Sequence, residues 1–243
     1  MLKWAWLSID RPEHAFEESA RFWTTVTGST LSARRGERGE FATLLPAGGG
    51  DASLKLQGVL SGNGAHIDLE FDDFERALAR AVDLGGTVVE RDGEWAYVTS
   101  PTGYGLCVTA WHGAWRAAGP FAAADGRRSR LDQVCIDIAP SAHDAEVAFW
   151  GGLTGLHVVP SSRWEEFSWL ERPAGFPVEV LFQRLGEERA TSAHLDVSSS
   201  DADAERAWHE SLGAEFVHEG GNWLVMRDPG GGTYCLIRRE PEA

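Results

Sequence analysis

Basic residues and long apolar runs are both scarce in this sequence. Lysine and arginine together number 22, against 37 aspartates and glutamates, which gives a formal net charge of −15 at pH 7. A surface of that charge repels nucleic-acid phosphates and anionic lipid headgroups. The sequence has neither the roughly 18 uncharged apolar residues of a membrane-spanning helix nor, at its start, the apolar core of a secretory signal. We therefore expect a cytoplasmic protein that binds neither nucleic acid nor membranes.

Cysteine is rare as well, and several common catalytic motifs are missing. The three cysteines, Cys107, Cys135 and Cys235, are too few and too scattered for a disulfide framework or a paired-CxxC zinc site. The sequence contains no phosphate loop of the G-x-x-x-x-G-K-[ST] type, no HExxH and no G-x-S-x-G. These absences argue against nucleotide-phosphate loops, zincin-type proteases and serine hydrolases of the nucleophile-elbow type.

What the sequence does contain is an internal repeat. The segment AHIDL at 65–69 recurs as AHLDV at 193–197, and this offset of 128 holds without a gap for about forty further residues. Trp95 then matches Trp223 and Cys107 matches Cys235, while the Phe-Trp pair at 22–23 matches that at 149–150 at an offset of 127. The repeat predicts two domains, at 1–114 and 131–243, joined by a linker at 115–130 that is rich in Ala, Gly and Arg.

Each copy divides again into two similar halves. Apolar residues alternate at 4–10, as in a strand, and recur at helical spacing at 12–27, where Gly28 ends the pattern. Short strands are expected near 40–45 and 53–57. The order then restarts with a strand at 66–71, a helix at 74–84 and strands at 87–90, 95–99 and 106–110. The chain therefore predicts an α+β fold in which a βαβββ unit occurs four times.

The order of these motifs resembles the vicinal oxygen chelate (VOC) superfamily, and within it small glyoxalase-like and bleomycin-resistance-like proteins. The motifs that carry the resemblance are His194-Leu195-Asp196, Leu212-Gly213-Ala214, Trp223, Asp228-Pro229-Gly230 and Cys235-Leu236. It implies tandem paired βαβββ modules that form two half-open glyoxalase-like barrels, each with a ligand cavity in its cup. It says little about the reaction, because one fold hosts many chemistries.

The resemblance also implies four cup-facing positions that hold a divalent metal in metal-using relatives. In the second domain these read Gln133, Glu179, His194 and Cys235. The first three are competent ligands, whereas metal-using relatives place Glu where Cys235 stands, and a thiolate is a poor ligand for hard metals. In the first domain the positions read Trp6, about Ser53, His66 and Cys107, and an indole cannot ligate a metal. We expect no resident cofactor, with Gln133, Glu179 and His194 as the alternative metal set.

The cup-lining residues have both functional and structural interpretations. An imidazole at a cavity floor suits a general base, although a histidine in a polar pocket is more often a hydrogen-bonded residue, and Asp68 and Asp196 or backbone carbonyls could hold His66 and His194. The thiols could be nucleophiles or buried fillers, and the tryptophans an aromatic wall or core. We predict His194 and Asp196 as catalytic candidates. The predicted ligand-binding residues are Trp6, His66, Trp95, Cys107, Gln183, Trp223 and Cys235.

Three functions follow as alternatives. The first is a metal-independent protein that binds a small organic molecule in its cup. The second is an enzyme, either a metal-assisted lyase, isomerase or dioxygenase with its site in the second domain or a metal-free one that uses a histidine base. The third is a scaffold whose cups are filled by side chains. A small-molecule partner and a monomeric or homodimeric state are expected.

Overall fold

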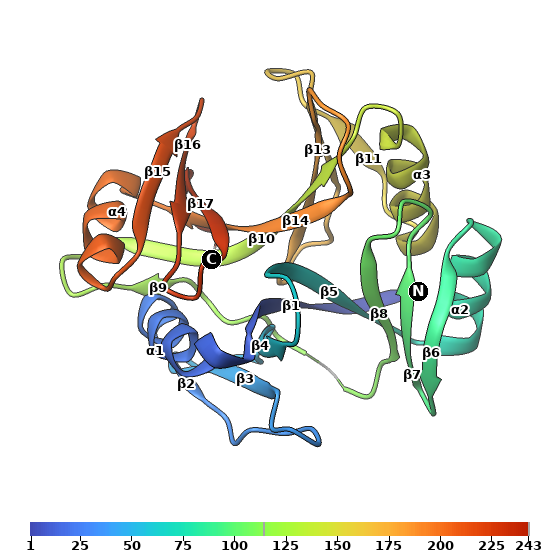
Figure 1. Cartoon of the computed structure of the whole chain (residues 1–243), viewed down its shortest axis with the longest axis horizontal. Helices are drawn as coiled ribbons and strands as arrows, with labels where there is room; N and C mark the ends of the chain where they lie inside the picture. Colours follow the sequence, from blue (N-terminus) through green and yellow to red (C-terminus); the bar gives the residue numbers. More distant parts are fainter. Residues whose placement is uncertain (114, 243) are drawn as a thin grey trace. The chain divides into compact units, whose positions relative to one another are not determined.

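The computed structural model describes residues 1–113 and 115–242. Within that range the chain has four α-helices and two large mixed sheets (Figure 1). The first sheet has the strand order β2-β3-β4-β1-β5-β8-β7-β6. Its elements are β1 (Leu2–Pro12), the 3-10 turn η1 (Glu13–Ala15), α1 (Phe16–Thr27), β2 (Ser29–Leu31), β3 (Phe41–Pro46), β4 (Leu54–Val59), β5 (Gly64–Phe71), α2 (Phe74–Asp83), β6 (Thr87–Asp92), β7 (Trp95–Thr99) and β8 (Gly105–Ala110).

The second sheet repeats this order as β11-β12-β13-β10-β14-β17-β16-β15, with the short β9 paired to β10. Its elements are β9 (Phe121–Ala122), β10 (Arg128–Ile138), α3 (His143–Thr154), β11 (Val158–Pro160), β12 (Phe167–Leu170), β13 (Glu179–Arg184), β14 (Ser192–Ser199), α4 (Ala202–Ser211), β15 (Glu215–Glu219), β16 (Trp223–Arg227) and β17 (Thr233–Arg238). The predicted α+β fold, with a βαβββ unit that occurs four times, is confirmed. None of the helices in the described range is both long and apolar enough to cross a membrane.

The sequence repeat is visible in how the helices begin and end. Helices α1 and α3 both stop at a glycine in the left-handed conformation, Gly28 with φ 60° and Gly155 with φ 73°. Helices α2 and α4 both begin at an aspartate, Asp73 or Asp201, whose side chain accepts a backbone N–H of the first turn at 3.0 Å. The glycines end their helices because a residue without a Cβ adopts the left-handed conformation at no steric cost. The aspartates begin theirs because the carboxylate accepts a backbone N–H that has no partner within the helix.

Not every predicted boundary is right. The expected helix 12–27 is wrong at its start, because β1 continues to Pro12 and η1 precedes α1. A proline φ suits both a helix start and an extended chain, and here the ψ of Pro12 is 140°. The short β2 was not expected, nor was β9, which falls with the first residues of β10 inside the predicted linker 115–130. The domain limits 1–114 and 131–243 themselves stay a prediction.

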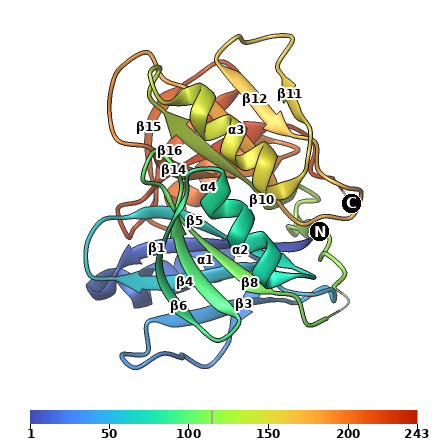
Figure 2. The ribbon, with the colours of Figure 1, turned by 90° about the vertical axis from the view of Figure 1, so that its right-hand side faces the viewer.

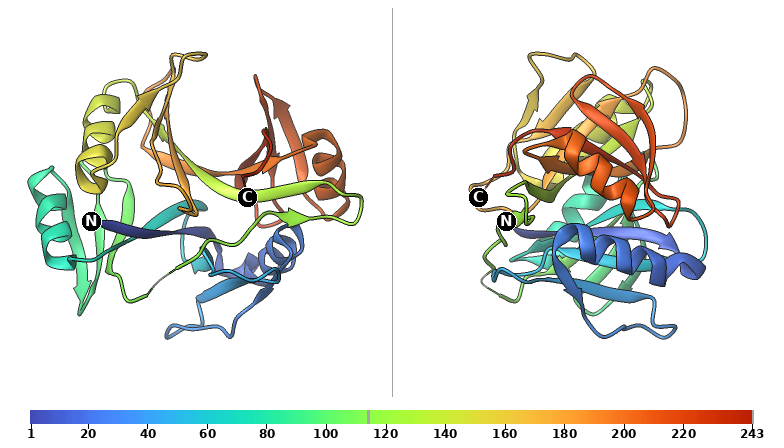
Figure 3. Two further views of the ribbon diagram at one scale, coloured as in Figure 1. Left: turned by 180° about the vertical axis from the view of Figure 1, so that it is seen from behind. Right: turned by 90° about the vertical axis from the view of Figure 1, so that its left-hand side faces the viewer.

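Compact packing divides the chain into two units, each of which combines one βαβββ module from each half. The first unit consists of Met1–Leu7, His66–Trp115 and Val134–Ala193, and the second of Ser8–Ala65, Arg116–Gln133 and His194–Ala243. In the first unit α2 packs against α3 (Figure 2). In the second, Phe22 of α1 meets His209 of α4, with ring centroids 5.4 Å apart; Figure 3, right, shows α1 in blue and α4 in orange.

A buried tryptophan bound to a carboxylate lies at the centre of each unit. In the first unit Trp150 donates its indole N–H to Glu146 of the same helix at 2.8 Å, and the ring of Tyr104 packs 6.1 Å from it. In the second unit the matching Trp23 donates to Asp228, at 2.9 Å. There the carboxylate comes from the turn after β16 instead of from the helix.

The second unit also buries an arginine beside this carboxylate. The Arg11 Nε donates to Asp228 Oδ2 at 2.7 Å, and both side chains are fully buried. Arg11 runs so close to Gly232 that a Cβ there would lie 2.0 Å from the guanidinium carbon. In the repeat Gly232 corresponds to Tyr104, so the arginine occupies the space that the tyrosine fills in the first unit.

We expect Asp228→Asn to destabilise the protein by about 3–5 kcal/mol, because it leaves the buried Arg11 without a counter-charge. The free energy of unfolding is measured by urea denaturation. Asp203→Asn is the matched control, because it removes an aspartate that pairs with Arg238 at the surface and should cost less than about 1 kcal/mol. Similar small losses in both variants would contradict the assigned role of the Arg11–Asp228 pair.

Candidate functional site

The candidate site of the first unit lies on the sheet face opposite α2. Strand β5 pairs in parallel with β8, and this register places Asp68 beside Cys107 and Leu69 beside Val108. Leu69 and Val108 are buried on the face that α2 covers. Because side chains alternate along a strand, Asp68 and Cys107 project from the opposite face together with His66.

Three different ligand atoms come together on that face. The Nε2 of His66 lies 3.3 Å from Oδ1 of Asp68, and the nitrogen, oxygen and sulfur of His66, Asp68 and Cys107 all lie within 4.8 Å of one another. The imidazole is partly open, with 16% of its side chain exposed, whereas the carboxylate and the thiol are buried. His66 is therefore the member of this cluster that a ligand can reach.

The chemistry of the thiol follows from its surroundings. Burial raises the pKa of Cys107 above its ordinary value, and the negative charge of Asp68 raises it further, while hydrogen bonding to His66 acts in the opposite direction. A thiol with a raised pKa is protonated at neutral pH, and the protonated form is a weak nucleophile. The structural interpretation of Cys107 is thus favoured over the nucleophilic one.

The second unit repeats the strand register of the first. Asp196 of β14 lies beside Cys235 of β17 in the parallel register, and Nε2 of His194 lies 3.4 Å from Oδ1 of Asp196. Gln133 donates a hydrogen bond from its side-chain amide to the other carboxylate oxygen of Asp196. The structure thus brings His194, Asp196, Gln133 and Cys235 to one face, as expected from the repeat.

The other predicted residues are placed as follows. Glu179 and Gln183 of β13 are half-buried and alternate with the buried Val180 and Phe182, so they share a face. They belong to the first unit, whereas Gln133 and His194 belong to the second, so neither unit by itself contains the complete metal set. That set stays a prediction.

The two predicted wall tryptophans lie at matching positions. Trp95 lies opposite Thr109 in the register of β7 and β8, and therefore on the same face as Cys107. Trp223 lies opposite Ile237 in the register of β16 and β17, on the same face as Cys235, and its indole rests against Gly220. Both are half-buried, and their role as a ligand wall stays a prediction.

Sequence reasoning missed part of the first unit's face. Glu70 lies on β5 two residues beyond Asp68, and it accepts the indole N–H of Trp6 at 2.8 Å and that of Trp115 at 2.8 Å. Trp115 lies at the start of the predicted linker 115–130. The signal available in the sequence was the spacing of His66, Asp68 and Glu70, which strand alternation places on one face.

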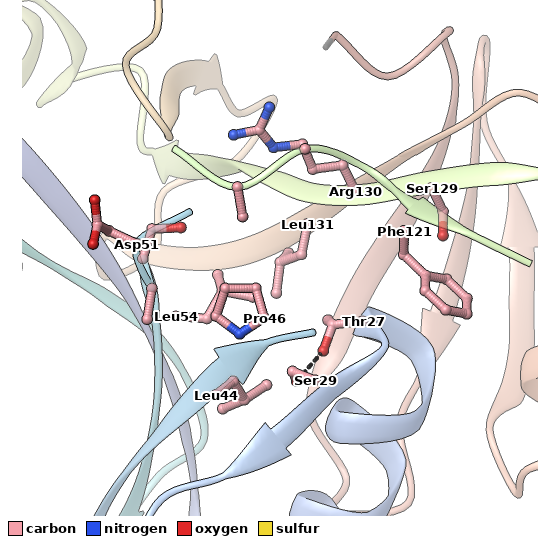
Figure 4. Close-up of a pocket in the computed structure, with 14 residues that line it drawn as sticks. Thr27, Ser29, Leu44, Pro46, Asp51, Leu54, Phe121, Ser129, Arg130 and Leu131 are labelled. Carbon is pink, nitrogen blue, oxygen red and sulfur yellow. Dashed lines mark hydrogen bonds between the residues drawn. The ribbon is translucent and has the colours of Figure 1, made fainter. Parts of the chain in front are cut away.

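A small cavity lies elsewhere in the second unit (Figure 4). Its volume is about 60 Å³, and a hydrogen bond of 2.6 Å joins Thr27 and Ser29 at its wall. Leu44, Pro46, Leu54, Phe121, Ser129 and Leu131 are among its other lining residues. Ser53, one of the four positions predicted for the first domain, lines it, whereas Trp6, His66 and Cys107 do not. The space suits a few water molecules rather than an organic ligand.

The donor atoms can be tested against a divalent metal. His66, Asp68 and Cys107 supply a nitrogen, an oxygen and a sulfur, which are ligand types that zinc accepts. They fit a hard metal such as manganese less well, because such metals prefer oxygen ligands, and the raised pKa of the thiol opposes the thiolate that zinc requires. In the second unit Asp196 already accepts the Gln133 amide. The donors therefore suit at most a zinc-like ion in the first unit.

Comparison with known proteins identifies the fold class. The crystal structure of 2,2',3-trihydroxybiphenyl 1,2-dioxygenase from Sphingomonas wittichii strain RW1 matches with a TM-score of 0.64 at 14% identity, covering 100% of this chain and 92% of that one. The Mn(II)-bound glyoxalase from Novosphingobium aromaticivorans matches with 0.64 at 16% identity, covering 99% and 82%. An extradiol ring-cleaving dioxygenase from B. fuscum matches with 0.62 at 14%, covering 98% and 71%. These identities establish a shared fold only.

The family follows from the sequence match. The glyoxalase-like domain family matches residues 6–109 and again residues 133–237. The chain therefore belongs to the glyoxalase-like domain family and carries two such domains in tandem. No curated protein matches it.

The raised pKa of Cys107 predicts a pH effect on stability. Because the folded thiol keeps its proton where the unfolded thiol would lose it, the stabilisation is complete below the unfolded pKa and is lost as the pH rises through about 9 toward the folded pKa. The stability advantage of wild type over Cys107→Ala should fall between pH 8 and pH 10, by up to roughly 1.4 kcal/mol per pH unit. Chemical denaturation at several pH values measures it. A pH-independent difference would contradict the stated environment.

Proposed function

We propose that this protein binds a small organic molecule on the sheet faces that carry the His-x-Asp pairs, without a resident metal. The observation that carries the proposal is the repetition of one arrangement in both units. In each, a partly open imidazole stands next to a buried carboxylate, and a cysteine lies beside that carboxylate on the neighbouring parallel strand. Small-molecule sites are usually lined by apolar and aromatic side chains with a few polar groups among them.

The absence of a metal is proposed from the donor chemistry. In the first unit the thiol of Cys107 is protonated, whereas a metal would need the thiolate. In the second unit the carboxylate of Asp196 already accepts a hydrogen bond from the Gln133 amide. The fold does not decide the matter, because the same fold supports many reactions. A cytoplasmic location and a monomeric or homodimeric state stay predictions from the sequence.

A second candidate is an enzyme of the superfamily, with its site in the predicted second domain, residues 131–243. The observation that favours it is the His194–Asp196 pair, because a carboxylate 3.4 Å from an imidazole nitrogen orients a general base and stabilises its charged form. Metal assistance would add Gln133 and Glu179 as ligands. The names of the structurally similar dioxygenases and of the manganese-bound glyoxalase support this candidate only as an analogy of fold.

Binding is tested by titrating the protein with a library of small aromatic and polar compounds and following each by calorimetry. We expect His66→Asn or His194→Asn to weaken a bound compound about tenfold, which corresponds to the loss of one good hydrogen bond. His218→Asn is the matched control, because His218 is exposed on β15 away from both sites. The proposal fails if no compound binds, or if all three variants bind equally well.

Metal content separates the two candidates. After incubation with zinc, manganese, nickel or iron and removal of the excess, elemental analysis should find less than one metal per chain. Stoichiometric metal that disappears in His194→Ala would support the metal-assisted enzyme and overturn the metal-free proposal. Stoichiometric zinc that disappears in His66→Ala would instead place an ion at the His66, Asp68 and Cys107 cluster.

A further inference from the structure

The first unit carries a second feature beside its imidazole, which is a carboxylate enclosed by indole rings. We call it the indole–carboxylate cluster, and it consists of Trp4, Trp6, Glu70 and Trp115. Trp6 and Trp115 each donate their indole N–H to one oxygen of Glu70, both at 2.8 Å. The rings of Trp6 and Trp115 lie nearly perpendicular, with centroids 6.1 Å apart, and the ring centroid of Trp4 also lies 6.1 Å from that of Trp115.

The charge of Glu70 is not neutralised by the protein. In the described part of the chain its carboxylate accepts hydrogen bonds from the two indole groups, and no lysine, arginine or histidine forms an ion pair with it. An indole N–H stabilises a carboxylate but carries no positive charge. A half-buried anion without a counter-ion attracts a cation from solution.

The indole rings favour one class of cation. Because Trp6 and Trp115 meet Glu70 through their N–H edges, their ring faces are turned elsewhere, and those faces carry the negative potential that attracts cations. Trp115 keeps 38% of its surface exposed. Indoles do not ligate metal ions, whereas a large, weakly hydrated ammonium group pairs well with aromatic faces and a carboxylate together.

Trp4, the most buried ring of the cluster, has an indole N–H that requires a hydrogen-bond acceptor. Trp4 is only 2% exposed, and its indole N–H is buried without an acceptor among the described residues. This donor lies in the same cluster, beside Trp115 and also beside Phe176, whose ring centroid is 6.4 Å away. An oxygen acceptor on a ligand would satisfy it, because a buried donor without a partner costs free energy.

The two halves of the chain differ at these positions. In the repeat Trp4, Trp6 and Glu70 correspond to Leu131, Gln133 and Ser198, while the His-x-Asp pair and the cysteine are kept. The second unit thus retains the imidazole and lacks the carboxylate and the indoles. The cluster is a property of the first unit and is not required by the fold.

We propose that the indole–carboxylate cluster recognises an organic ammonium group that also carries a neutral oxygen, as in an amino alcohol. This inference rests on the proposed function, since it names the class of molecule that the first unit would take. Glu70 supplies the charge, the faces of Trp6 and Trp115 contact the alkyl groups of the ammonium, and Trp4 donates to the oxygen.

The test compares two probes of the same shape and different charge. Choline carries a quaternary ammonium and a hydroxyl group, and 3,3-dimethyl-1-butanol is its neutral isostere. By calorimetry on the full chain we expect choline to bind at least about tenfold more tightly and its affinity to fall as sodium chloride is added. Equal affinities, or no binding of choline, would overturn the proposal without any variant being made.

Variants then locate the effect. Glu70→Gln keeps the shape and removes the charge, so it should weaken choline about tenfold and leave the neutral isostere unchanged. Glu90→Gln removes the same charge from an exposed position of β6 in the same unit and should change neither. Unchanged choline binding in Glu70→Gln would also overturn the proposal, provided that circular dichroism shows the variant folded.

Failure of the ammonium-binding inference can be distinguished from failure of the proposed function. If neutral compounds bind in a manner that depends on His66 while choline shows no preference over its isostere, only the present inference fails. If choline binds through Glu70 but His66→Asn has no effect on any compound, the cluster is a cation site and the proposed role of the imidazole fails.

Discussion

The parallel pairing of β5 with β8, and of β14 with β17, is the constraint on which both candidate sites depend. Each pair joins two strands separated in sequence by a helix and a hairpin, and its register sets an aspartate beside a cysteine. The histidine two residues before that aspartate then shares its face by strand alternation alone. A slip of one residue in either pair would turn the whole set toward the helices. The buried leucines and valines on the helix side therefore fix the position of the polar groups on the other side.

A second constraint is that each unit must provide hydrogen-bond or ion-pair partners for its buried charged groups. Both place a carboxylate under a tryptophan N–H, but one takes it from α3 and the other from the turn after β16. This difference between the units involves several positions at once. The buried Arg11 requires the carboxylate of Asp228 as its partner and the absence of a side chain at Gly232. The second unit adds a buried series in which Glu205 contacts His209 and His209 contacts the hydroxyl of Tyr234, whose pKa burial raises well above its usual range. These networks hold helices to sheets and leave the opposite faces free to diverge.

The repeat made the fold predictable, and strand alternation made part of the site predictable. His66 and Cys107, like His194 and Cys235, could be assigned to one face because each occurs in a clear alternating strand next to a turn. The start of α1 could not be predicted, because Pro12 is compatible with both a helix start and an extended strand. Glu70 and Trp115 were missed for a different reason. Their contact joins a strand to the segment after β8, and no local pattern of either segment encodes it.

The two copies share some residues and differ at others. Residues needed only to form the fold should persist in both units, as the capping aspartates Asp73 and Asp201 do. The imidazole, carboxylate and thiol persist too, although a sheet face of this kind does not require them for packing. The indole–carboxylate cluster has no counterpart in the second unit, and its charge is uncompensated where a purely structural position would favour an apolar or paired side chain. A carboxylate that has no ion-pair partner among the described residues and is confined to one copy is more simply explained by binding than by folding.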